Sequence, residues 1–271
     1  MIISYDSPSL LRRAAGFGYA VAAYLGFFAT FAYFVLRAMG YVERWGLGAG
    51  ITLPPFTALG WNVTLIATFA VQHSVMARPG FKRVLTRIVP QPLERATYLW
   101  ASNIALALAC VLWASSPGES WSLWQLESSI LGWGVWGLGL LGWLGVAGSS
   151  FLIDHFEMFG LRQAFCWATK HPFIHNEFKT PGAYRVVRHP MLLSMLVGLW
   201  CAQEMTASRL SLSALLTGYI LLGVRLEERD LVAIFGARYL SYAERVPQLI
   251  PHFGRRHPRT DANTGQATPA E

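Results

Sequence analysis

The sequence predicts an all-α polytopic membrane protein, a helical bundle of about five to six membrane segments. The first observation is composition: 54% of the 271 residues are apolar and 14% are charged, whereas soluble domains carry roughly 25% charged residues. The second is a mean hydropathy of +0.37. The third is that the basic residues gather between long apolar runs, as in the cytoplasmic loops of membrane proteins. This placement accounts for the net charge of +7 without nucleic acid as a partner.

The apolar runs set the expected membrane segments, because a helix needs about 20 apolar residues to cross the hydrocarbon layer. The first run, residues 14–36, is too long for a signal peptide, and no small-residue cleavage site follows it. We therefore expect it to stay in the membrane. Two later runs, 191–203 and 210–224, are too short to span at ~1.5 Å per residue. Around the polar residues 204–209 they predict a C-terminal helical hairpin that spans incompletely or is extended by its flanks. The four long runs are 14–36, 57–76, 96–118 and 128–153.

The charge distribution predicts the orientation. With the N-terminus inside and the hairpin counted as one excursion into the membrane, 19 of the 22 Lys and Arg residues fall on the inner side. Only Arg37, Arg44 and Arg209 fall outside. Positive charge concentrates on the cytoplasmic side of membrane proteins, so we expect both termini to be cytoplasmic.

After residue 224 the chain turns polar. Residues 225–235 predict a helix that continues from the hairpin and ends at Gly236, and residues 239–245 predict a second short helix that stops before Pro247. We expect residues 1–251 to form a single membrane-embedded domain and residues 252–271 to be a disordered cytoplasmic tail, because few apolar positions remain there.

Two patterns suggest sites that we do not favour. The motif G-x-G-x-x-G occurs twice between Gly132 and Gly142, but it lies inside an apolar helix, where close packing through small residues explains it better than dinucleotide binding. His171 and His175 have the spacing of a helical metal pair, but Pro172 separates them. The three cysteines lie far apart. We therefore expect no metal site.

Ionisable residues stand at the inner ends of two predicted spans. His73 ends the second, and Asp154 and His155 end the fourth. Such groups can simply snorkel to the interface, but several that converge at one depth favour a functional site. Both interpretations remain open from these residues alone.

The region 178–251 is the richest in candidate ligand-binding residues. The entrance to the hairpin carries Arg188, His189 and Pro190, and its exit carries the charged run Glu227-Glu228-Arg229-Asp230. Because a hairpin brings its two ends together, we expect these polar sets to face each other. A salt-bridge network is one interpretation. The aromatic residues that accompany the charges favour a ligand with an adenine ring, a ribose diol and a zwitterionic amino acid; they are Tyr184, Tyr239 and Tyr242.

The order Y-R-x-x-R-H-P, an apolar hairpin, then L-E-E-R-D-L-x-x-x-F-G-x-x-Y-x-x-Y-x-x-x-V-P resembles the isoprenylcysteine carboxyl methyltransferase superfamily of membrane enzymes. The upstream segments QHSVMARPGFKRVLTRIVPQPLERATY and FLIDHFEMFGLRQ resemble, more specifically, the bacterial methanethiol S-methyltransferases. The resemblance covers about residues 60–251. A neighbouring family linked to nitric-oxide-related denitrification shares the layout of the superfamily.

This resemblance implies methyl transfer from S-adenosylmethionine to a small thiol, with methanethiol giving dimethyl sulfide, in a bacterial inner membrane. It implies a cytoplasmic cofactor site in the region 178–251. One departure is that the prenylcysteine enzymes commonly carry Tyr soon after His-Pro, where this chain has Met191-Leu192-Leu193. By motif position the cofactor-binding residues are Tyr184, Arg188, His189, Pro190, Glu227 and Glu228, with Tyr239 closing the site.

The implied reaction needs a thiolate as its nucleophile. His73, Asp154 and His155 are the candidate bases, and Arg162 or Arg188 can supply a positive field. The rival functions are a methyltransferase for a larger or carboxylate acceptor, and a transporter or other non-catalytic membrane protein. Transporters usually contain internal repeats, and none is evident here. The expected partners are a small thiol and the lipid bilayer; the sequence does not indicate an oligomeric state.

Overall fold

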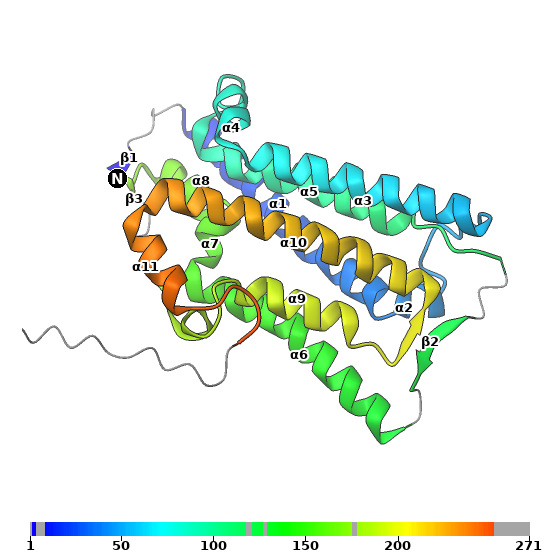
Figure 1. Ribbon diagram of the computed structural model, residues 1–271. Coiled ribbons are helices and arrows are strands. Elements are labelled where there is room, and N and C mark those ends of the chain that lie inside the picture. Colours follow the sequence, from blue (N-terminus) through cyan, green and yellow to red (C-terminus); the bar gives the residue numbers. More distant parts are fainter. Residues whose placement is uncertain (1, 4–8, 118–120, 127–128, 175–177, 252–271) are drawn as a thin grey trace, which may run out of the picture.

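The computed structural model describes residues 2–3, 9–117, 121–126, 129–174 and 178–251 (Figure 1). Three of the described helices are long and apolar enough to cross a membrane, which confirms the predicted all-α membrane bundle. The predicted tail, 252–271, lies outside the described residues. The three long helices are α1 (Leu10–Ala38), α6 (Ile130–Ile153) and α10 (Ala207–Phe235).

Two further helices run beside the long ones. α3 (Pro55–Ala77) matches the second predicted run, but α5 (Glu94–Val111) ends well before residue 118, so the third predicted segment is too long. The reason is a side chain on α3. Asn62 donates to the carbonyl of Ala114 and accepts from its amide, each at 2.9 Å, and so holds this stretch as non-helical chain.

Two glycines of α6 allow the short helix α9 (Pro190–Trp200) to pack closely against it. A Cβ on Gly142 would lie 2.5 Å from the backbone nitrogen of Gly198, and a Cβ on Gly139 would lie 2.3 Å from the carbonyl oxygen of Cys201. Neither space admits a side chain. The expected close helix packing through small residues is therefore confirmed at Gly139 and Gly142.

The C-terminal hairpin has unequal arms. α9 has only 11 residues, as its short apolar run predicts, and the chain then becomes extended in β4 (Glu204–Thr206), which pairs antiparallel with β2 (Ser122–Gln125). The second arm is extended by its polar flank, which is one of the two outcomes that the sequence predicts. The apolar run and the polar residues after it form one continuous helix, α10, of 29 residues, roughly 43 Å long.

The short elements gather at the two ends of the bundle (Figure 1). α2 (Tyr41–Arg44) lies at the same end as β2 and β4. At the other end α10 ends at Gly236, whose φ of +54° suits glycine, and α11 (Ala237–Arg245) follows, as predicted. The remaining elements are β1 (Ile2–Ile3) paired with β3 (Phe173–Ile174), α4 (Pro79–Leu85), α7 (His155–Met158), α8 (Leu161–Thr169) and the 3₁₀ turns η1 (Gln91–Leu93) and η2 (Gly182–Arg185).

Two apolar clusters hold the helices together. One lies among α1, α6, α9 and α10 around Phe34, Trp143 and Leu216. The other joins α1, α5 and α8 around Ala23 and Trp167. Large apolar side chains also cover the outside of the long helices, as lipid-facing surfaces require.

Candidate active site

The two ends of the hairpin meet in a polar cluster formed by Arg188, His189, Glu227, Glu228 and Tyr239, which we name the hairpin cluster. The Oε1 atom of Glu228 accepts from Arg188 Nε at 2.7 Å and from the Tyr239 hydroxyl at 3.3 Å, and it lies 3.1 Å from His189 Nε2. The other ring nitrogen of His189 lies 3.5 Å from Glu227 Oε2. The predicted polar sets at the entrance and the exit of the hairpin therefore do face each other.

Backbone contacts fix the entrance side of this cluster. The amide of Arg188 donates to the carbonyl of Pro247 at 2.8 Å, and the Arg188 guanidinium donates to the carbonyls of Ala243 and Val246 at 2.7 and 2.9 Å. A cation that binds the last carbonyls of a helix also complements the helix dipole. Arg188 thus locks the end of α11 against the start of α9, which Pro190 begins as its first residue.

The two carboxylates differ in their access to solvent. The Glu228 side chain is 20% exposed and its Oε1 is occupied by three partners, whereas the Glu227 side chain is 54% exposed and meets the edge of His189. The cluster thus combines a mostly buried anion, Glu228, that holds the hairpin together with a more accessible anion, Glu227, beside it.

The surroundings shift the pKa values of the cluster in definite directions. Burial lowers the pKa of His189, but hydrogen bonds and charge attraction from Glu227 and Glu228 outweigh it, so the net pKa is raised. Burial, together with the charge of Glu227, raises the pKa of Tyr184 to about 12. At neutral pH His189 is therefore biased toward its cationic form, and Tyr184 keeps its proton as a hydrogen-bond donor.

An aromatic group borders the cluster. The ring of Phe178 lies within 5.0 to 6.0 Å of the rings of Phe235, Tyr239 and Tyr242, and the Tyr242 hydroxyl donates to the carbonyl of Tyr184 at 2.6 Å. Sequence reasoning did not single out Phe178 or Phe235. The sequence did contain a signal for them, because Phe178 precedes the first charged run and Phe235 follows the second.

His73, near the end of α3, lies in a second polar group where α3, α5 and α10 meet. Its Nε2 atom is 2.8 Å from the Tyr98 hydroxyl, and its Nδ1 atom is 3.2 Å from Ser102 Oγ. Its ring also contacts Tyr219 on α10, whose hydroxyl is 3.3 Å from Ser74 Oγ. The sequence analysis missed Tyr98, Ser102 and Tyr219, because only packing of α3, α5 and α10 brings them to His73.

His155 lies in a third group, between α1 and α6. Its Nδ1 and Nε2 atoms are each 2.7 Å from a hydroxyl, those of Ser150 and Tyr24, and its ring stacks on Phe151 at 4.0 Å. Burial lowers the pKa of His155, against a smaller opposing effect of Asp154. Both of its ring nitrogens have partners, so it is well placed to join two helices.

Asp154 and Arg162 form an ion pair at the same corner. Arg162 donates to Asp154 at 2.7 Å and to Glu157 at 3.1 Å, and Asp154 also accepts from the Glu157 amide at 3.0 Å, which caps α7. Both residues line an open, mostly apolar hollow of about 710 Å³ whose other walls include Tyr24, Phe156 and Phe165.

The structure thus gathers the predicted cofactor residues in and beside one cluster, whereas it distributes the predicted catalytic residues over two other groups. Among the described residues, no three His, Cys, Asp or Glu side chains come together in a way that could hold a metal ion. His175 lies outside the described residues.

Comparison with known proteins gives relatives along nearly the whole chain. The chain is 39% identical over 257 residues to "Methanethiol S-methyltransferase 2" of Bradyrhizobium diazoefficiens, covering 93% of this chain and 95% of the relative. It is 40% identical over 242 residues to "Methanethiol S-methyltransferase" of Mycobacterium tuberculosis, covering 89% and 98%. It is also 30% identical over 206 residues to "Nurim" of Rattus norvegicus, covering 71% and 73%. No family model and no solved structure matches.

Proposed function

The chain belongs to the methanethiol S-methyltransferase family, and we propose that it is an integral membrane enzyme that methylates methanethiol with S-adenosylmethionine. In this reaction the methanethiolate sulfur forms a bond to the methyl carbon while the methyl–sulfonium bond breaks. The products are dimethyl sulfide and S-adenosylhomocysteine, and the thiol proton passes to a base. The observation that carries the proposal is the relationship over about nine-tenths of the chain to proteins of this name.

The hairpin cluster has the donors and acceptors that S-adenosylmethionine needs. The accessible carboxylate of Glu227 suits the ammonium group or the ribose hydroxyls, and His189, whose pKa is raised, holds Glu227 from the side and contributes positive charge near the amino-acid end. Tyr184, which keeps its proton, adds a donor, and the aromatic group around Phe178 offers apolar surface for a purine. When bound, S-adenosylmethionine supplies an electrophilic methyl group on a positively charged sulfur.

Within this proposal Glu228, Arg188, Pro190 and Tyr239 act by positioning. Glu228 and Arg188 join the two arms of the hairpin, and Tyr239 closes the cluster from α11. Because their atoms are occupied by one another, their role is to hold Glu227 and His189 in place.

We assign the proton transfer to His73 in preference to His155 or Asp154. His73 contacts α10, the helix that carries Glu227, whereas His155 is bound between α1 and α6 and Asp154 is paired with Arg162. The hydroxyls of Tyr98 and Ser102 can adjust to either protonation state of His73. In this proposal the role of the other three residues is to stabilise the junction of α6, α7 and α8; they are Asp154, His155 and Arg162.

We also propose that the hairpin cluster faces the cytoplasm of a bacterial inner membrane. Nineteen of the 22 basic residues fall on this side in the proposed orientation. The other three, Arg37, Arg44 and Arg209, belong to the opposite end, where Arg209 donates to the carbonyl of Met39.

The direct test is to incubate the purified protein in detergent with methanethiol and S-adenosylmethionine and to measure dimethyl sulfide by headspace gas chromatography. The expected result is product formation well above the protein-free rate. If no product forms while calorimetry shows bound S-adenosylhomocysteine, the methanethiol assignment is wrong. Larger thiols and carboxylates are then tested as acceptors with the same protein.

A further inference from the structure

The end of the bundle opposite the hairpin cluster holds a second cavity, which the proposed reaction does not use. It has a volume of about 420 Å³, within the ~300–1,000 Å³ typical of small-molecule sites. Its walls come from three places: the end of α1 with α2, residue Trp136 on α6, and the segment from Cys201 to Arg209 that joins α9 to α10.

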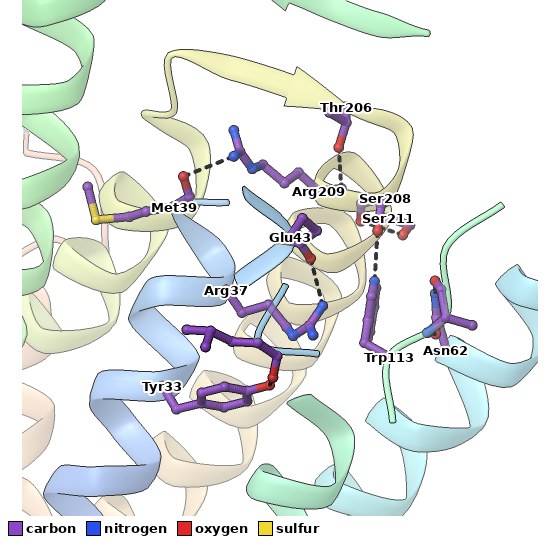
Figure 2. Close-up of polar contacts among 12 residues, drawn as sticks. Tyr33, Arg37, Met39, Glu43, Asn62, Trp113, Thr206, Ser208, Arg209 and Ser211 are labelled. Carbon is purple, nitrogen blue, oxygen red and sulfur yellow. Dashed lines mark hydrogen bonds and ion pairs between the residues drawn. The ribbon is translucent and has the colours of Figure 1, made fainter. Parts of the chain in front are cut away.

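Both cationic and anionic side chains line this cavity. Arg209 lies across it and donates to the carbonyl of Met39 at 2.9 Å (Figure 2). It also donates to the carbonyl of Glu204. Arg44 is exposed and forms no ion pair with a described residue. Glu43 accepts from the buried Arg37 at 2.7 Å but stays 45% exposed, and the Glu204 carboxylate accepts from Ser122 at 2.9 Å.

Of the four charged side chains that line the cavity, two are cations and two are anions; Arg37, which pairs with Glu43, is buried and is not part of this lining. A simple anion site would carry an excess of positive charge, whereas this arrangement complements a ligand that itself holds one positive and one negative group. The anion of that ligand would meet Arg44 and Arg209, and its cation would meet Glu43 and Glu204.

The surface of α6 next to the cavity is apolar and exposed. Trp136 donates to the Tyr41 hydroxyl at 3.0 Å, and aromatic residues with a polar contact are typical of the membrane–water interface. Next to Trp136 on the same helix, Leu131 and Trp133 are 65% and 62% exposed. A polar cavity beside an exposed apolar helix surface matches a molecule with a charged head and an apolar tail.

We propose that this cavity binds the headgroup of a zwitterionic phospholipid with a primary amine, a phosphatidylethanolamine. Arg44 and Arg209 bind the phosphate, Glu43 and Glu204 bind the ammonium group, and the acyl chains lie along the exposed surface of α6. The site is separate from the proposed reaction, so its loss leaves methyl transfer in detergent unchanged.

The test uses native mass spectrometry of the full chain in detergent with added lipids. Phosphatidylethanolamine is compared with phosphatidylcholine, which has the same charges but no N–H donors, and with phosphatidylglycerol, which lacks the cation. We expect phosphatidylethanolamine to be retained best. Arg44→Gln and Glu204→Gln should each weaken its binding about tenfold, as for the loss of one hydrogen bond to a charged group.

Arg12→Gln is the matched control, because Arg12 is also an exposed arginine but lies at the other end of α1. Its affinity for phosphatidylethanolamine should equal that of the unaltered protein. Equal retention of the three lipids, or equal effects of the Arg12 and Arg44 changes, would overturn the proposal. Displacement of the lipid by millimolar inorganic phosphate would instead identify a site for free anions.

Discussion

Arg188 and Glu228 lie 40 residues apart in the sequence, yet Arg188 Nε donates to Glu228 Oε1 at 2.7 Å across the two arms of the hairpin. The same carboxylate oxygen also meets His189 and Tyr239. Its neighbour Glu227 meets the edge of His189, and its side chain is about half exposed. We therefore expect Glu227 and Glu228, although adjacent, to have different roles.

Replacing these two carboxylates should separate stability from cofactor affinity. Glu228→Gln leaves the mostly buried Arg188 without its anion, so we expect the unfolding free energy to fall by about 2–3 kcal/mol. Glu227→Gln changes a half-exposed group, so stability should change by less than about 0.5 kcal/mol while the affinity for S-adenosylhomocysteine falls at least about tenfold. Thermal unfolding in detergent and calorimetric titration measure the two effects. Equal effects of both changes on both measurements would contradict this division.

The raised pKa of His189 predicts a pH-dependent contribution to stability. A group whose pKa is higher in the folded state stabilises it fully below the unfolded pKa of about 6.5, and this contribution is lost as pH rises through the folded pKa. The melting temperature of the unaltered protein should therefore exceed that of His189→Gln by more at pH 6 than at pH 9. Parallel pH curves for the two proteins would show that His189 carries no such linkage.

His73→Gln should lower kcat by roughly 100-fold or more, because it removes the proposed proton acceptor. Binding of S-adenosylhomocysteine should be unchanged. His155→Gln is the comparison: it removes a residue bonded to Tyr24 and Ser150, so it should lower the melting temperature more than kcat. Dimethyl sulfide formation and calorimetry on both variants decide between the two histidines, and the reverse pattern would move the base to His155.

The glycine contact between α6 and α9 predicts a position-specific effect. Gly142→Ala places a Cβ against the backbone of Gly198, so we expect a loss of about 1–3 kcal/mol in stability from overpacking. Gly134→Ala on the same helix meets no atom within 4 Å and should be neutral or slightly stabilising. Thermal unfolding of both variants provides the measurement. Equal melting temperatures for the two variants would show that the close contact between Gly142 and Gly198 does not set the stability of this helix pair.

The proposed orientation predicts the behaviour of fused reporters. A green fluorescent protein fused after residue 271 should fluoresce, because it folds in the cytoplasm, and alkaline phosphatase fused there should be inactive. The same phosphatase inserted in the loop 46–50, at the opposite end, should be active. The opposite pattern would place the hairpin cluster outside the cytoplasm.

The sequence by itself determined the all-α membrane class and the approximate bounds of the long helices other than α5. These features depend on local quantities: the length of an apolar run, a breaker such as Gly236, and the spacing of charged residues along the chain. Because a hairpin must return, the meeting of Arg188 and His189 with Glu227 and Glu228 also followed from the sequence.

Only the tertiary structure decided how each of these side chains is used. The burial of Glu228 and the exposure of Glu227 depend on the rotation of α10 about its axis. Tyr98 and Tyr219 reach His73 from α5 and α10, and Asn62 ends a neighbouring helix near Ala114 by bonding to its backbone. Such contacts join residues distant in sequence, and their geometry is set by helix packing, which a local pattern of residues does not contain.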